Sequence, residues 1–120
     1  MAVYLVRHAK AGDRHDYQGD DRFRPLTKPG WRQAEGLVAM FADVAIARLL
    51  SSPYTRCMQT LEPLAAARAV AIEPEPRLAE GNSFTAVMAL FDELADAPAV
   101  LCSHGDVIPD VIDALVRRGA

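Results

Sequence analysis

The chain has 120 residues, enough for one domain, and an α/β core of this size buries roughly two-thirds of the surface that the unfolded chain exposes. With 51% hydrophobic and 24% charged residues, the composition excludes a disordered or fibrous protein. The net charge of -3 gives no reason to expect a nucleic acid polymer as partner.

The apolar runs argue against a membrane-spanning protein, and the cysteines argue against a disulfide-rich or metal-knuckle protein. No apolar run approaches the roughly eighteen residues of a membrane span, and the chain enters its first apolar run without a basic leader. We therefore expect a cytoplasmic protein with no membrane partner. Cys57 and Cys102 are the only cysteines, and two such residues make neither a disulfide framework nor a metal knuckle.

The first half of the chain predicts strand, loop, helix and strand in that order. The run at 2–6 is almost continuously apolar, which favours a central strand that is buried on both faces. Residues 12–25 are rich in Asp and Arg without an apolar period, so we expect a loop. Thr27 is placed to cap a helix whose apolar residues, up to Phe41, recur at spacings of three and four. A second strand is expected at 44–50.

The second half of the chain repeats this alternation. We expect Ser52 to cap a helix with Pro53 at its first position, where a missing N–H costs nothing. The apolar run at 70–72 is followed by prolines, which belong at the margin of a sheet. The remaining expected elements are a helix capped by Ser83, a strand at 99–102 and a helix at 107–117.

Strands that alternate with helices are typical of a parallel sheet covered by helices. We therefore predict an α/β fold with three α/β/α layers and a mainly parallel sheet. Because the sequence contains no repeat or linker, residues 1–120 are expected to form a single domain. The chain stops after its last predicted helix, and a further C-terminal strand would then belong to a longer parent protein.

Polar segments directly follow three of the predicted strands. These segments are Arg7-His8-Ala9-Lys10, Ser51-Ser52-Pro53-Tyr54-Thr55-Arg56 and Ser103-His104-Gly105. In open α/β sheets, ligands bind beyond the carboxyl ends of the strands. We therefore expect the three segments to converge on one ligand.

His8 is the candidate nucleophile, because its position after a buried strand holds the imidazole rigidly with small residues beside it. The role requires a neutral ring, in which one nitrogen donates to a backbone carbonyl and the other presents its lone pair to phosphorus. A structural histidine is the alternative, and it is the commoner case for an isolated residue.

Arg56 and His104 are candidates for binding an anion. Arg56 is predicted in the first turn of a helix, where its charge opposes the helix dipole but suits a phosphate site. A surface ion pair with Glu62 or a neighbouring residue is the alternative. His104 can donate to a phosphoryl oxygen, and Gly105 after it allows close approach of the backbone to a ligand. Together with Arg7 and His8, these residues form a cluster that chance rarely assembles.

These segments carry a resemblance to a known family. Val6-Arg7-His8-Ala9 resembles the RHG signature of the histidine phosphatase superfamily, also called phosphoglycerate mutase-like, with Ala9 in place of the usual glycine. Further similar motifs are Ser52 to Arg56 with Gln59-Thr60, Ser103-His104-Gly105, and Leu26-Thr27 with Gly30 and Gln33-Ala34. The resemblance spans nearly the whole chain.

The resemblance implies a phosphatase that forms a phosphohistidine at His8. It implies that Arg7, Arg56 and His104 hold the phosphoryl oxygens and that no metal or other cofactor is required. Larger family members use a Glu as proton donor, in a segment similar to 77–81. We nominate Glu80, with a solvated loop carboxylate as the alternative.

Two branches of the family are similar to this chain. Short SixA-type members, which dephosphorylate phosphohistidine on proteins, share its small size and its lack of an inserted cap domain. The histidine phosphatase-like domain found with actinobacterial Nudix hydrolases is similar at 19–26, 62–65 and 107–110, and implies a nucleotide or other small phosphate ester. The competing hypothesis is a non-catalytic domain that binds phosphate or a partner protein.

The remaining candidates would contact the rest of a substrate, and they are Lys10, Arg22, Arg24 and Gly105. Lys10 lies two residues from His8, although solvent is the alternative for its side chain. Arg22 and Arg24 could reach a remote anionic group, or could equally be surface residues. The loop with His15 contains both acidic and basic residues, and we expect it to be solvated rather than to bind a metal. The sequence does not determine the oligomeric state.

Overall fold

A computed structural model describes residues 3–13, 16–81, 83–94 and 97–104. Four strands form one parallel sheet in the order β1-β4-β2-β3. The strands are β1 (Val3–Arg7), β2 (Arg48–Ser51), β3 (Ile72–Pro74) and β4 (Ala99–Ser103). The predicted parallel sheet is thus confirmed.

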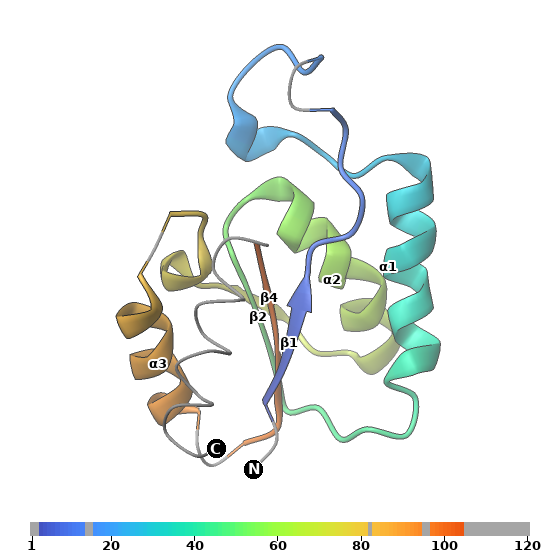
Figure 1. Cartoon of the computed structure of the whole chain (residues 1–120). Helices are drawn as coiled ribbons and strands as arrows, with labels where there is room; N and C mark the ends of the chain where they lie inside the picture. The colour runs from blue at the N-terminus through green and yellow to red at the C-terminus, as the bar shows by residue number, and fades with distance from the viewer. Residues whose placement is uncertain (1–2, 14–15, 82, 95–96, 105–120) are drawn as a thin grey trace.

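Helices cover both faces of this sheet, which confirms the three predicted layers. Helices α1 (Lys28–Met40) and α2 (Thr55–Arg68) lie on one face, and α3 (Phe84–Glu93) lies on the other (Figure 1). Two short 3-10 turns, η1 (Asp21–Phe23) and η2 (Pro76–Leu78), complete the described elements. No helix in this part of the chain is long and apolar enough to cross a membrane.

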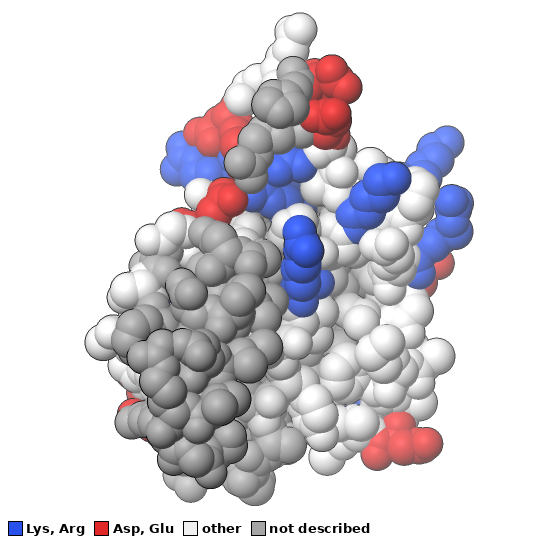
Figure 2. All heavy atoms as spheres, in the orientation of Figure 1, with Lys and Arg blue, Asp and Glu red and all other residues white. Residues whose placement is uncertain are grey.

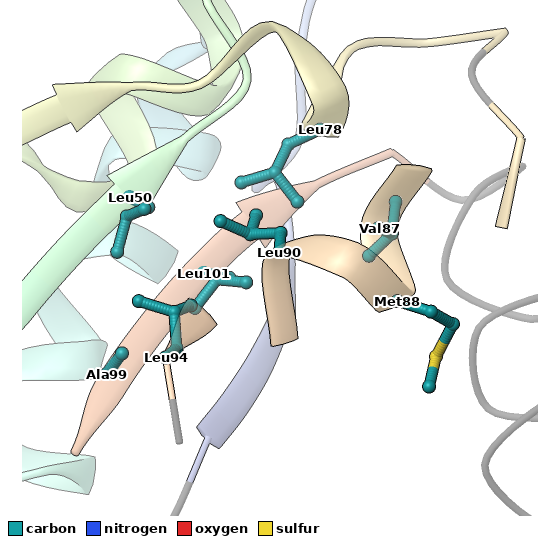
Figure 3. Close-up of a cluster of buried hydrophobic side chains, with 8 residues drawn as sticks. All are labelled: Leu50, Leu78, Val87, Met88, Leu90, Leu94, Ala99 and Leu101. Atoms are coloured by element: carbon teal, nitrogen blue, oxygen red, sulfur yellow. The ribbon is translucent and has the colours of Figure 1, made fainter. Parts of the chain in front are cut away.

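Alternation along the strands divides the core between the two faces, because successive side chains of a strand point to opposite sides. Leu50 and Leu101 face α3 and η2, in a cluster that includes Leu78 and Leu90 (Figure 3). Their neighbours in the strands, among them Leu49, belong to a second cluster with residues of α1 and α2. Both faces of the sheet are therefore held by buried aliphatic contacts.

The order of the strands differs from one expectation. β4 is buried along its whole length between β1 and β2, whereas β1 is mostly half-buried and is an outer strand of the described sheet. The expectation of a central strand at 2–6 is wrong for this sheet. A continuous apolar run indicates that both faces of a strand are covered. It does not indicate whether the strand has neighbouring strands on both edges.

Element boundaries show where sequence patterns succeed and fail. The side chain of Thr27 caps α1 by accepting from the N–H of Gly30 at 3.1 Å, as predicted. The second strand begins only at Arg48, and Val44 and Ile46 before it pack against the core outside the strand. The N-cap of α2 is Tyr54, so the prediction that Ser52 caps this helix is wrong. The helix expected at 107–117 lies outside the described residues.

Candidate active site

The carboxyl ends of the strands bring the polar segments together. In the sheet register Arg7 of β1 lies opposite Ser103 of β4, and the N–H of His8 donates to the Ser103 carbonyl at 3.1 Å. The rings of His8 and His104 consequently meet edge to face, with centroids 5.5 Å apart and planes at 66°. Two imidazoles at this separation can touch a single tetrahedral anion.

The imidazole of His8 has a defined tautomer. Its Nδ1 lies 2.8 Å from the carbonyl oxygen of Ala9, and a carbonyl oxygen can only accept, so the proton is on Nδ1. The lone pair is then on Nε2. Burial lowers the pKa of His8 below its ordinary value of 6.5, against the raising effect of the Ala9 hydrogen bond, and nearby Arg56 and His104 lower it further. The ring is therefore oriented and favours the neutral form, as attack by His8 on phosphorus would require.

The loop after His8 is anchored to both neighbouring helices. The N–H of Ala9 donates to Thr60 Oγ1 of α2 at 2.9 Å, and the N–H of Lys10 donates to Gln33 Oε1 of α1 at 2.9 Å. A side chain at Gly30 would place its Cβ 2.0 Å from the Lys10 carbonyl oxygen, so α1 begins in contact with this loop. Gln33 and Thr60 appeared in the sequence only as parts of motifs, with no role assigned.

Arg56 is 1% exposed and is surrounded by polar groups. Its guanidinium donates from Nη1 to the Asp21 carbonyl at 2.9 Å, and from Nη2 to Asp21 Oδ2 at 3.2 Å and to Glu80 Oε2 at 3.4 Å. Asp21 Oδ1 also accepts from Arg24 Nε at 2.8 Å. The partner proposed as the alternative for Arg56, Glu62, is exposed on α2 and is not a partner in these hydrogen bonds.

Asp21 was missed in the sequence analysis, because it is one of several acidic residues in a loop without a period. Thirty-five positions separate it from Arg56. The turn η1 brings it over the start of α2, at the end of the molecule toward which β1 points (Figure 1).

His104 is 2% exposed and lies among side chains of the β2–α2 connection. Its Nε2 is 2.8 Å from Ser52 Oγ and 3.6 Å from Cys57 Sγ. The ring of Tyr54 meets His104 edge to face at 4.7 Å, and Arg56 Cζ lies 4.9 Å from the same Tyr54 ring. Tyr54 therefore packs against both groups that are expected to bind an anion. The hydroxyl of Ser52, predicted as a helix cap, instead contacts this histidine.

A cleft of about 570 Å³ opens beside His8. Its lining includes Arg7, Lys10, Arg24 and Gln33, so three cationic residues line the cleft together with His8. Figure 2 shows Lys and Arg side chains gathered in the upper half of the view, the end toward which β1 points in Figure 1, with acidic side chains on the loop at the top. A positive cleft of this kind attracts phosphate groups.

The candidate substrate contacts separate into three groups. Lys10 and Arg24 line the cleft with His8. Arg22 is not among its lining residues; its Nε donates to Asp20 Oδ2 at 3.0 Å, and its guanidinium lies over the ring of Phe23. Gly105 lies outside the described residues.

Residues 3–84 match the model of the histidine phosphatase superfamily, branch 1. The chain belongs to this superfamily. Among curated relatives, this chain is similar to the 8-oxo-(d)GTP phosphatase of Mycolicibacterium smegmatis. The two are 41% identical over 97% of this chain and 38% of the relative. This chain thus spans well under half of that relative's length.

Two solved structures of phosphatases have the same fold. The protein histidine phosphatase SixA complexed with tungstate is 26% identical, with a TM-score of 0.79 over 90% of this chain and 72% of that chain. The alpha-ribazole phosphatase from Shigella flexneri is 18% identical, with a TM-score of 0.77 over 96% of this chain and 79% of that chain, which shows the fold alone. Family and fold therefore agree: the chain has the architecture of the histidine phosphatase superfamily.

Proposed function

We propose that the chain hydrolyses a phosphorylated substrate through a covalent phosphohistidine on His8. The geometry of His8 carries the proposal: its Nδ1 is fixed by the Ala9 carbonyl, burial favours its neutral form, and its ring lies 5.5 Å from that of His104. Such a ring presents the Nε2 lone pair to phosphorus without first losing a proton.

The reaction has two displacements at phosphorus. In the first, the Nε2 lone pair of His8 forms the N–P bond while the bond from phosphorus to the leaving group breaks. In the second, water attacks phosphorus, the N–P bond breaks, and phosphate leaves with the Nε2 lone pair restored. Charge spreads over the equatorial phosphoryl oxygens in both steps, so positioned cationic donors supply much of the catalysis.

Arg7, Arg56 and His104 are the proposed donors to these oxygens. Two buried atoms support this assignment, since Arg56 Nε and His104 Nδ1 have no hydrogen-bond partner among the described residues. If the Ser52 hydroxyl donates to His104 Nε2 over their 2.8 Å contact, Nδ1 carries the proton and is a donor. A phosphoryl oxygen would accept from both atoms.

Glu80 is the proposed proton donor to the leaving group. Its carboxylate lies 3.4 Å from Arg56 Nη2, and its side chain is 31% exposed, so it can reach both the phosphate site and solvent. After donating its proton, the carboxylate can take one from the attacking water.

Two substrate classes follow from different observations. Three cations in one cleft favour a small substrate with more than one anionic group, such as a nucleotide, and the relative that is 41% identical is named for activity on 8-oxo-(d)GTP. The likeness to SixA favours phosphohistidine on a protein. We propose a small phosphorylated metabolite of the nucleotide class first and a phosphohistidine protein second, acting in the cytoplasm.

A substrate panel with a metal chelator present tests the proposal. We expect turnover of p-nitrophenyl phosphate and of one class among nucleotides, sugar phosphates and phosphohistidine peptide, together with an acid-labile phosphoryl label that is absent in His8→Ala. No turnover on the whole panel, with His8→Ala binding inorganic phosphate as tightly as the wild type, would instead establish a non-catalytic binding domain.

A further inference from the structure

We propose that Thr60 is a positioning residue whose hydroxyl sets the spacing between the loop of His8 and the helical turn of Arg56. The inference rests on the proposed function, in which His8 attacks the phosphorus that Arg56 binds. Beyond that function, the hydroxyl would hold the loop after β1 and helix α2 in one fixed geometry.

The hydrogen bonds of Thr60 have only one possible direction. Its Oγ1 accepts from the N–H of Ala9 at 2.9 Å, and it donates to the carbonyl of Arg56 at 2.6 Å. An N–H can only donate and a carbonyl can only accept, so the single hydroxyl proton is committed to Arg56. The side chain is 1% exposed, and both bonds are buried.

One of these bonds is ordinary for a helical threonine. Thr side chains inside helices commonly donate to the carbonyl four residues earlier, which here belongs to Arg56. The other bond spans 51 positions and joins α2 to the loop after β1. The intrahelical bond thus orients the hydroxyl so that its lone pair faces Ala9.

Thr60 acts at the residue that orients the nucleophile. The Ala9 carbonyl fixes His8 Nδ1, while the Ala9 N–H is bonded through a planar peptide to the His8 carbonyl. Other bonds tie this loop to β4, through Ser103, and to α1, through Gln33. The Thr60 bond ties it to α2, the helix that carries Arg56.

Without the hydroxyl, the N–H of Ala9 would be left buried without an acceptor. The loop would then shift to satisfy this group, and His8 and Arg56 would no longer keep their mutual distance. Misplacement of reacting groups by about 1 Å can slow a reaction by about 10²-fold.

Three variants of the full chain separate this role from a general effect on stability. Thr60→Val keeps the side-chain volume and removes both bonds, whereas Thr60→Ser keeps the hydroxyl. Arg68→Met is the matched control, because it removes hydrogen bonds to the carbonyls of Phe41 and Val44 at the other end of the same helix. If Thr60→Val does not fold, Thr60→Ala is measured in its place.

With p-nitrophenyl phosphate we expect Thr60→Val to lower kcat by about 10²-fold, with a smaller change in KM. Thr60→Ser and Arg68→Met should stay within a few-fold of the wild type. A Thr60→Val enzyme with wild-type kcat overturns the inference, as does equal loss in Thr60→Val and Arg68→Met.

Ring ¹⁵N spectra of His8 give a readout that needs no turnover. We expect the Nδ1–H tautomer in the wild type and a mixture of tautomers in Thr60→Val. An inactive wild type would count against the proposed function, while the spectra would still decide the role of Thr60. Identical spectra in both proteins would refute that role.

Discussion

The Asp21 carboxylate lies against the guanidinium of Arg56, with Oδ2 3.2 Å from Nη2. The backbone carbonyl of Asp21 accepts from Nη1 of the same group at 2.9 Å. An acidic residue of the loop before α1 thus occupies part of the guanidinium that we propose for phosphate binding. Loop and substrate are expected to compete for this arginine.

Replacing Asp21 by Asn should strengthen binding of inorganic phosphate. The amide removes a negative charge beside the anion site, and one charge at about 4 Å in water contributes about 1 kcal/mol, or about five-fold in Kd. Titration calorimetry at low salt measures the effect. Asp20→Asn, which alters the exposed pair with Arg22, is the control and should leave Kd unchanged. Weaker binding in Asp21→Asn would show that Asp21 orients Arg56 instead.

The activity should fall on the acid side through the pKa of His8. Because burial lowers this pKa below 6.5, the ring stays neutral to a lower pH than an exposed histidine would. Protonation occupies Nε2, so kcat/KM decreases as the pH drops through that pKa. An NMR titration of the His8 ring in the free enzyme checks the assignment. A pKa above 6.5 would contradict the role of burial.

Replacing Gly30 by Ala should destabilise the protein by about 1–3 kcal/mol, as overpacking of a close contact does. The added Cβ would lie 2.0 Å from the carbonyl oxygen of Lys10, which is backbone and cannot rotate away. Gly36→Ala in the same helix meets nothing within 4 Å, and it should instead stabilise by about 0.5–1 kcal/mol. Urea unfolding of the two variants measures the difference, and equal effects would exclude the close contact as the cause.

Replacing Tyr54 by Leu should weaken phosphate binding, because its ring contacts both His104 and Arg56. Loss of a cation–π contact of about 0.5–2 kcal/mol corresponds to roughly two- to thirty-fold in Kd. Tyr54→Phe keeps the ring and should bind phosphate as the wild type does. If Phe is as weak as Leu, the hydroxyl of the tyrosine is the group that matters.

Replacing Glu80 by Gln should slow hydrolysis of alkyl phosphates by about 10²–10⁴-fold, the usual contribution of a general acid. p-Nitrophenyl phosphate should be affected much less, since nitrophenolate leaves without a proton. Steady-state rates on both substrates give the comparison. Glu73→Gln, in the ion pair with Arg48, is the control away from the site. Equal slowing of both substrates would assign Glu80 a binding role instead.

Several parts of the fold were predictable because their causes are local. The cap at Thr27 depends on one side chain and the first turn of α1. The layers of the core follow from alternation in strands such as β4 and from helical spacing in α1 and α2. The position of β1 at the outside of the described sheet was not predictable, since strand order depends on how the helical connections pack.

By itself, the sequence determined which residues gather at the candidate active site. His8, Arg56 and His104 each follow a parallel strand, and the carboxyl ends of such strands share one edge of the sheet. Only the tertiary structure decided what each polar atom touches: Ser52 contacts His104 rather than capping α2, Asp21 contacts Arg56, and Thr60 contacts Ala9. These partners lie 52, 35 and 51 positions apart, so the packing of loop and helices on the sheet selects them and no local pattern encodes them.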